Sequence, residues 1–129
     1  MVRILLLIVA GLISAPLMEV LSVIWFRTLP AGIDLTANYF LSVVLPMALI
    51  LHFIMALLLW KVFEPDPKRY CTIYVGTHVL TEAAMLTILG NPMADVALFC
   101  LTVIASGALV MTVFSRYFWC PACAAPPEA

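Results

Sequence analysis

His78 and Glu82 lie one helical turn apart in the stretch from residue 70 to 89, which is otherwise mostly apolar. Residues four apart share one face of an α-helix, so the imidazole and the carboxyl group face the same way. Such a pair can share a proton, and acid–imidazole chains inside membranes serve as proton relays in pumps and transporters. Thr77 and Thr81 add hydroxyl groups beside the pair. The spacing predicts a proton or cation site.

Two more ionisable side chains interrupt apolar stretches, Glu19 near the N-terminus and His52 in the second quarter of the chain. A rise of about 1.5 Å per residue places His78 at a depth of about 9 Å, His52 at about 13 Å and Glu82 at about 15 Å. Glu19 is deeper on that scale, at about 22 Å. We therefore expect three of these side chains in one layer of a helical bundle, and Glu19 one to two turns beyond it.

The same residues allow other interpretations. His52, His78, Glu82 and Glu19 are all metal-ligand types, although no second ligand motif supports a metal site. A haem held between His52 and His78 is a further alternative, because axial ligation needs two histidines at similar depth. The plainest alternative is structural: these side chains hydrogen-bond the helices together, with Glu82 protonated and the threonines bonded to backbone carbonyls. No cofactor is expected under the first interpretation.

A second motif, Cys120-Pro-Ala-Cys123, lies in the C-terminal tail. A C-x-x-C pair can bind a soft metal or act as a redox couple. Redox pairs usually open a helix, whereas this pair follows one, where the helix dipole opposes thiolate formation. Cys120 and Cys123 thus form a weak candidate metal site, and an incidental tail is the favoured alternative.

The elements that must position these groups are membrane spans. Of the 129 residues, 66% are hydrophobic and only 10% are charged, too few charges to cover a soluble domain of this size. The apolar stretches predict an all-α, up-down bundle of four transmembrane helices over about 4–26, 39–62, 72–89 and 94–118. Pro46 is expected to kink the second helix near its middle. Residues 119–129 form a short tail.

Basic residues give the expected orientation. Four spans place the N-terminus, the middle loop and the C-terminus on one side, which carries five basic residues against only Arg27 on the other. By the positive-inside rule both termini are then cytoplasmic, which fits a bacterial inner membrane. Aromatic residues, Tyr74 among them, fall near the expected span ends, as interfacial anchors do. The five basic residues are Arg3, Lys61, Lys68, Arg69 and Arg116.

Charge and motifs also limit the function. A net charge of −1 gives no basic patch for nucleic acid. Neither a nucleophile elbow nor a phosphate loop occurs in the sequence, so an ordinary hydrolase is not expected, and the balance is against an enzyme without deciding the question. The sequence favours a small proton- or cation-coupled transporter or ion-conducting unit that acts as an oligomer in the lipid bilayer. The alternatives are an accessory or assembly subunit of a larger membrane complex, and a haem- or metal-handling membrane protein.

Overall fold

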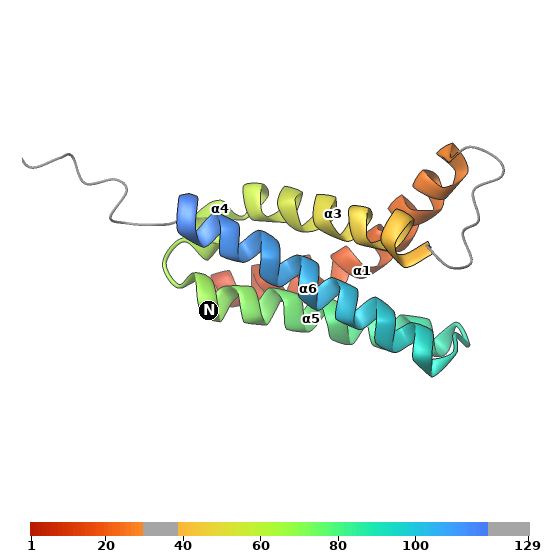
Figure 1. Ribbon diagram of the computed structural model, residues 1–129. Coiled ribbons are helices and arrows are strands. Elements are labelled where there is room, and N and C mark those ends of the chain that lie inside the picture. The colour runs from red at the N-terminus through yellow and green to blue at the C-terminus, as the bar shows by residue number, and fades with distance from the viewer. Residues whose placement is uncertain (30–38, 119–129) are drawn as a thin grey trace, which may run out of the picture.

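The structure, a computed structural model, describes residues 1–29 and 39–118, and all of its regular elements in these ranges are helices (Figure 1). Four helical segments of 19 to 27 residues are long and apolar enough to cross a membrane, which needs about 20 residues. The expected all-α membrane bundle is confirmed. The helices are α1 (Val2–Thr28), η1 (Phe40–Val44) continuing into α3 (Leu45–Leu58), α4 (Trp60–Phe63), α5 (Pro67–Ile88) and α6 (Met93–Tyr117).

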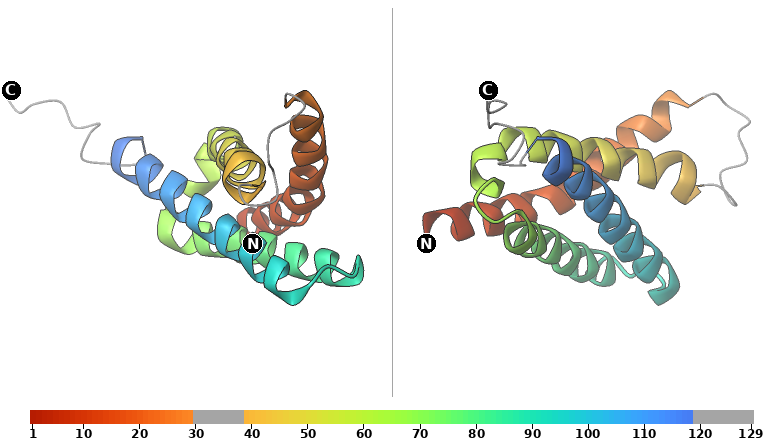
Figure 2. Two further views of the ribbon diagram at one scale, coloured as in Figure 1. Left: turned by 45° about the vertical axis from the view of Figure 1, so that its right-hand side comes forward. Right: turned by 60° about the vertical axis from the view of Figure 1, so that its left-hand side comes forward.

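The chain reverses direction between successive long helices (Figure 1). The N-terminus, the turn between α4 and α5 and the last turn of α6 share one end of the bundle, where the five basic residues also lie. The turn between α5 and α6 lies at the opposite end. Figure 2 shows that the helices cross at open angles and do not run side by side along their whole length. α5 packs against α1 and α6, whereas α3 packs mainly against α6 and α1.

The second span contains an irregular segment where a proline kink was expected. Pro46 lies in the first turn of α3, and the five residues before this helix, Phe40–Val44, form the π-helix η1, with the Leu45 N–H bonded to the Phe40 carbonyl. Proline has no N–H to donate to the carbonyl four residues earlier, which belongs to Ser42. That carbonyl accepts a hydrogen bond from Trp25 Nε1 at 3.0 Å. The indole of α1 therefore supports the carbonyl that Pro46 leaves without its helical donor.

This contact predicts a small loss of stability for Trp25→Phe. Removing one such hydrogen bond should lower the free energy of unfolding by about 1 kcal/mol. Trp60→Phe is the matched control, because Trp60 Nε1 is buried without a hydrogen-bond partner among the described residues. Thermal unfolding in detergent, followed by circular dichroism, should show a lower midpoint for Trp25→Phe only. Equal midpoints for the two variants would contradict the role of the Trp25 bond.

α5 begins earlier than the apolar stretch, at Pro67. The Asp66 side chain caps it by accepting a hydrogen bond from the Arg69 N–H at 3.2 Å, and Pro67 occupies the first turn, where a missing N–H costs nothing. The helix ends at Ile88; Gly90, whose φ of 79° suits glycine, follows the cap residue, and the Asn91 N–H bonds back to the Leu86 carbonyl. These two ends fix the register of the helix that carries His78 and Glu82.

The core consists of two apolar layers with a polar layer between them. One layer surrounds Tyr74 and Phe114 toward the end with the basic residues, and the other surrounds Met18 and Leu86 toward the opposite end. On each of α3, α5 and α6 the residues between these layers include a buried polar side chain: His52, His78 with Glu82, and Ser106. The bundle therefore shelters its polar groups in the middle, away from lipid.

Candidate functional site

The centre of the polar layer is the pair that the spacing predicted. His78 Nε2 and Glu82 Oε2 lie 3.9 Å apart on α5, and both side chains are 0% exposed. At this distance the two groups interact electrostatically when both are charged, but they are too far apart for a hydrogen bond of ordinary geometry, so proton transfer between them needs a closer approach or one bridging water. The α5 face that carries them is the face that the other helices cover, so neither group is left in contact with lipid.

His52 of α3 meets this pair from the other side of the bundle. The rings of His52 and His78 are 5.3 Å apart between centroids, with an angle of 45° between their planes. His52 Nδ1 is 3.1 Å from Ser106 Oγ on α6, and Ser106 also donates to the Val103 carbonyl at 3.1 Å. A serine hydroxyl has one hydrogen, so this arrangement makes His52 Nδ1 the donor and leaves a lone pair on Nε2.

Tyr74 extends the cluster by one turn along α5. Its ring lies 6.3 Å from the ring of His78 and 5.8 Å from that of His52, centroid to centroid. Its hydroxyl group is 3.1 Å from Ser14 Oγ of α1, and Ser14 donates its own hydrogen to the Ala10 carbonyl at 2.7 Å. Tyr74 is fully buried, so its expected interfacial position was wrong. The spacing Tyr74-x-x-x-His78-x-x-x-Glu82 was the signal that could have placed it on the polar face.

Glu19 joins the cluster from α1. It is half-buried, and its Oε1 atom is enclosed. Its carboxyl group interacts electrostatically with that of Glu82, although no hydrogen bond of ordinary geometry joins the two. The structure thus brings together all four side chains that were selected from the sequence: Glu19, His52, His78 and Glu82.

Most of the buried polar atoms that lack a hydrogen-bond partner belong to these four residues. Within the described ranges eight such side-chain atoms occur, and six of them are Glu19 Oε1, His52 Nε2, both nitrogens of His78 and both oxygens of Glu82. Leaving a buried polar atom unpaired costs about 1–3 kcal/mol, so each such atom calls for an explanation, such as backbone strain, a catalytic role, or a bound water or ion. Their concentration at one point marks this cluster as the candidate functional site.

Metal and haem fit this cluster less well. Among residues 1–29 and 39–118 no three His, Cys, Asp or Glu side chains are grouped so that they could hold a metal ion. A haem would have to separate the two histidine rings, but these pack against each other, and His52 Nε2 lies 3.4 Å from where a Cβ of Gly107 would be. Cys120 and Cys123 lie outside the described residues.

Comparisons with known proteins add no family to this description. The chain matches no protein-family model, and no curated protein or solved structure is significantly similar to it. The assignment of this small helical membrane protein therefore depends on the chemistry of the Glu19–His52–His78–Glu82 cluster.

Proposed function

We propose that this protein is a proton-coupled transporter or ion-conducting unit, in which the Glu19–His52–His78–Glu82 cluster binds the coupling proton. The observation that carries the proposal is the set of six unpartnered buried atoms on these four side chains. A carboxyl group next to two imidazoles offers several positions for one proton, and acid–imidazole chains of this kind serve as proton relays in pumps and transporters. The proton is favoured over a metal cation because the described residues offer no three-ligand group.

The contacts suggest an order of transfer through the membrane. Glu19 is the partly exposed member and interacts with Glu82. Glu82 lies 3.9 Å from His78, whose ring packs against those of His52 and Tyr74. Tyr74 continues to Ser14, nearer the end with the basic residues. A proton entering at Glu19 would pass from carboxyl group to imidazole before reaching the tyrosine hydroxyl.

The structural alternative would have these groups bonding helices together. It predicts hydrogen bonds from His78 and Glu82 to neighbouring helices, as buried polar groups that fix helix register make. Among the described residues, neither side chain makes one. In the described part of the chain, the hydrogen bonds that join side chains of two different helices are those of His52 with Ser106 and of Tyr74 with Ser14. This difference favours a proton-binding role over a purely structural one.

Oligomerisation and location are also part of the proposal. Because four helices bury His52, His78 and Glu82 completely, conduction needs either an opening motion or a route along an interface between copies. We infer a homo-oligomer in a bacterial inner membrane, with both termini in the cytoplasm as the basic residues predict.

The proposal is tested by reconstituting the purified full chain in liposomes that contain a pH-sensitive dye. A potassium diffusion potential drives protons inward, and internal acidification gives the flux. We expect a rate at least about tenfold above protein-free liposomes, as expected when a positioned side chain carries the proton. A rate equal to that of empty liposomes would contradict the proposal. Recovery of a stoichiometric partner in a mild-detergent pull-down, with no flux by the isolated protein, would support the accessory subunit instead.

A further inference from the structure

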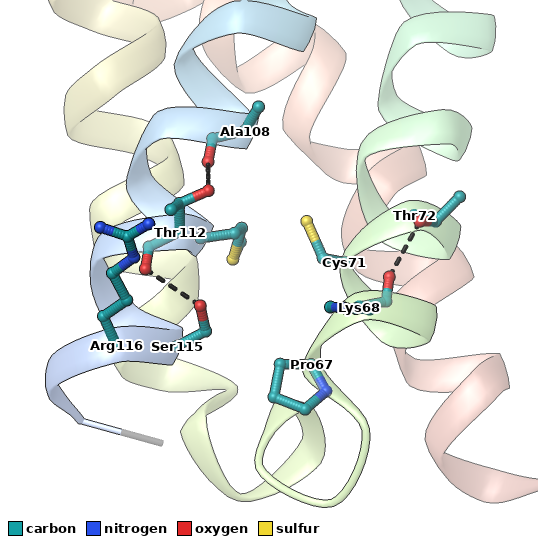
Figure 3. A pocket seen from close by; sticks show the side chains of 9 residues that line it. Pro67, Lys68, Cys71, Thr72, Ala108, Thr112, Ser115 and Arg116 are labelled. Carbon is teal, nitrogen blue, oxygen red and sulfur yellow. Dashed lines mark hydrogen bonds between the residues drawn. The ribbon is translucent and has the colours of Figure 1, made fainter. Parts of the chain in front are cut away.

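A groove runs between α5 and α6 on the outside of the bundle, starting at the end with the basic residues. Its first part has a volume of about 460 Å³ and is lined by Lys68, Thr72, Ser115 and Arg116, among others. Figure 3 shows Lys68 and Cys71 extending from α5 toward α6, with Ser115 and Arg116 at the end of α6. Its second part, of about 320 Å³, is lined largely by the apolar residues Val75, Gly76, Val79 and Ile104.

The two parts form one continuous surface, because Cys71, Thr72 and Ala108 line both. Each volume lies within the range of roughly 300–1,000 Å³ that is typical of ligand sites. The groove is open toward the position of the lipid and does not reach the buried cluster, from which Val75 and Gly107 separate it. Its occupant should therefore come from the membrane.

The charges in the groove define the polar end of that occupant. Lys68 and Arg116 are both exposed, and neither forms an ion pair with any residue in the described part of the chain. The nearby hydroxyl groups donate their hydrogens to their own helices, Thr72 to the Lys68 carbonyl and Thr112 to the Ala108 carbonyl. The ammonium and guanidinium groups are thus the donors left for an anion, while the hydroxyl oxygens can accept hydrogens from it.

We propose that the α5–α6 groove binds one anionic glycerophospholipid, with the phosphate between Lys68 and Arg116 and an acyl chain along Val75, Gly76 and Ile104. Basic pockets between transmembrane helices at the membrane surface recognise anionic head groups. The groove pairs such a pocket with an apolar extension toward the bilayer centre. The small residues Gly76 and Ala108 keep that extension open, and a Cβ on Gly76 would meet no atom within 4 Å.

The test uses the full chain in detergent, titrated with phosphatidylglycerol and read by native mass spectrometry. Each basic residue near an anionic lipid contributes about a fivefold gain, so the double variant Lys68→Gln/Arg116→Gln should bind roughly 25-fold more weakly. The matched control is Arg3→Gln/Lys61→Gln, which removes the same charges from the same end of the bundle but outside the groove. Its affinity should stay within about twofold of the wild type. Equal losses in both double variants would overturn the proposal.

Three further measurements distinguish a bound anionic phospholipid from a zwitterionic lipid, a free phosphate compound and a second copy of the chain. Ala108→Phe fills the groove while keeping both charges, and should weaken binding roughly tenfold because the acyl chain loses buried apolar area. Phosphatidylcholine, or glycerol 3-phosphate without chains, binding as tightly as phosphatidylglycerol would overturn the proposal. A third result would also overturn the proposal: the wild type is a dimer, and Ala108→Phe dissociates it without changing lipid binding. The groove would then hold a second copy of the chain. Circular dichroism confirms that each variant is folded.

Discussion

Glu82→Gln is expected to abolish the proton flux of the reconstituted protein, so that acidification falls to the rate of protein-free liposomes. A positioned group that gives and takes a proton contributes roughly 10²–10⁴ to the rate of transfer, and an amide of the same shape cannot do so. Glu82 is 0% exposed and lies between Glu19 and His78, so no bulk water lies beside it to bypass the lost step. The measurement is internal acidification of dye-loaded liposomes under a potassium diffusion potential.

Two variants control this experiment. Glu64→Gln makes the same chemical change at an exposed residue whose carboxylate pairs with Lys61 at 3.2 Å, and it should leave the flux unchanged. Glu82→Asp keeps the ionisable group but shortens the side chain, so it should retain part of the flux. Glu82→Gln should also remain folded, because it removes no hydrogen bond found among the described residues. Unchanged flux in a folded Glu82→Gln protein would show that the carboxyl group does not carry the proton.

The fold could be predicted from the sequence because few backbone structures can satisfy their hydrogen bonds inside the hydrocarbon core of a membrane. A chain with so few charges must satisfy its backbone groups internally, and four long apolar stretches can do so only as helices. The cost of an ionisable side chain in lipid then decides which faces turn inward, and this placed His52, His78 and Glu82 in the interior before any contact was known. The burial of these three residues therefore follows from the free-energy cost of placing an ionisable side chain in lipid.

The contacts between the side chains of the site could not be predicted from the sequence, for a different reason. Depth along a helix says how far a residue lies from the membrane surface, but contacts also depend on crossing angles, which side-chain packing sets. Glu19 was expected one to two turns from the layer, and only the arrangement of α1 against α5 shows that its carboxyl group acts electrostatically on that of Glu82. Ser106 and Ser14 looked like ordinary helix residues, and only the helix arrangement shows that they bond His52 and Tyr74.

The crossing of α1 and α5 depends on Gly11, and Gly11→Ala is expected to destabilise the protein by about 1–3 kcal/mol. A Cβ there would lie 2.7 Å from Thr77 Cβ and 2.9 Å from the Tyr74 carbonyl oxygen. Neither atom can rotate away, since one is backbone and the other is fixed to it, so the two helices must separate. Tyr74 and His78 would then move relative to Ser14, and the hydrogen bond between Tyr74 and Ser14 would lengthen.

Gly76→Ala on α5, the helix that Gly11 packs against, is the matched control, because the added Cβ would have no neighbour within 4 Å. Alanine in a helix interior is favoured over glycine by about 0.5–1 kcal/mol, so this variant should be slightly stabilised. Gly107→Ala should fall between the two, since its closest contact, at 2.8 Å, is with a Val75 methyl group that can rotate. Unfolding midpoints in detergent, followed by circular dichroism, give the order. If Gly11→Ala and Gly76→Ala shift the midpoint in the same direction, the close approach of α1 to α5 is wrong, and with it the position of Glu19 beside Glu82.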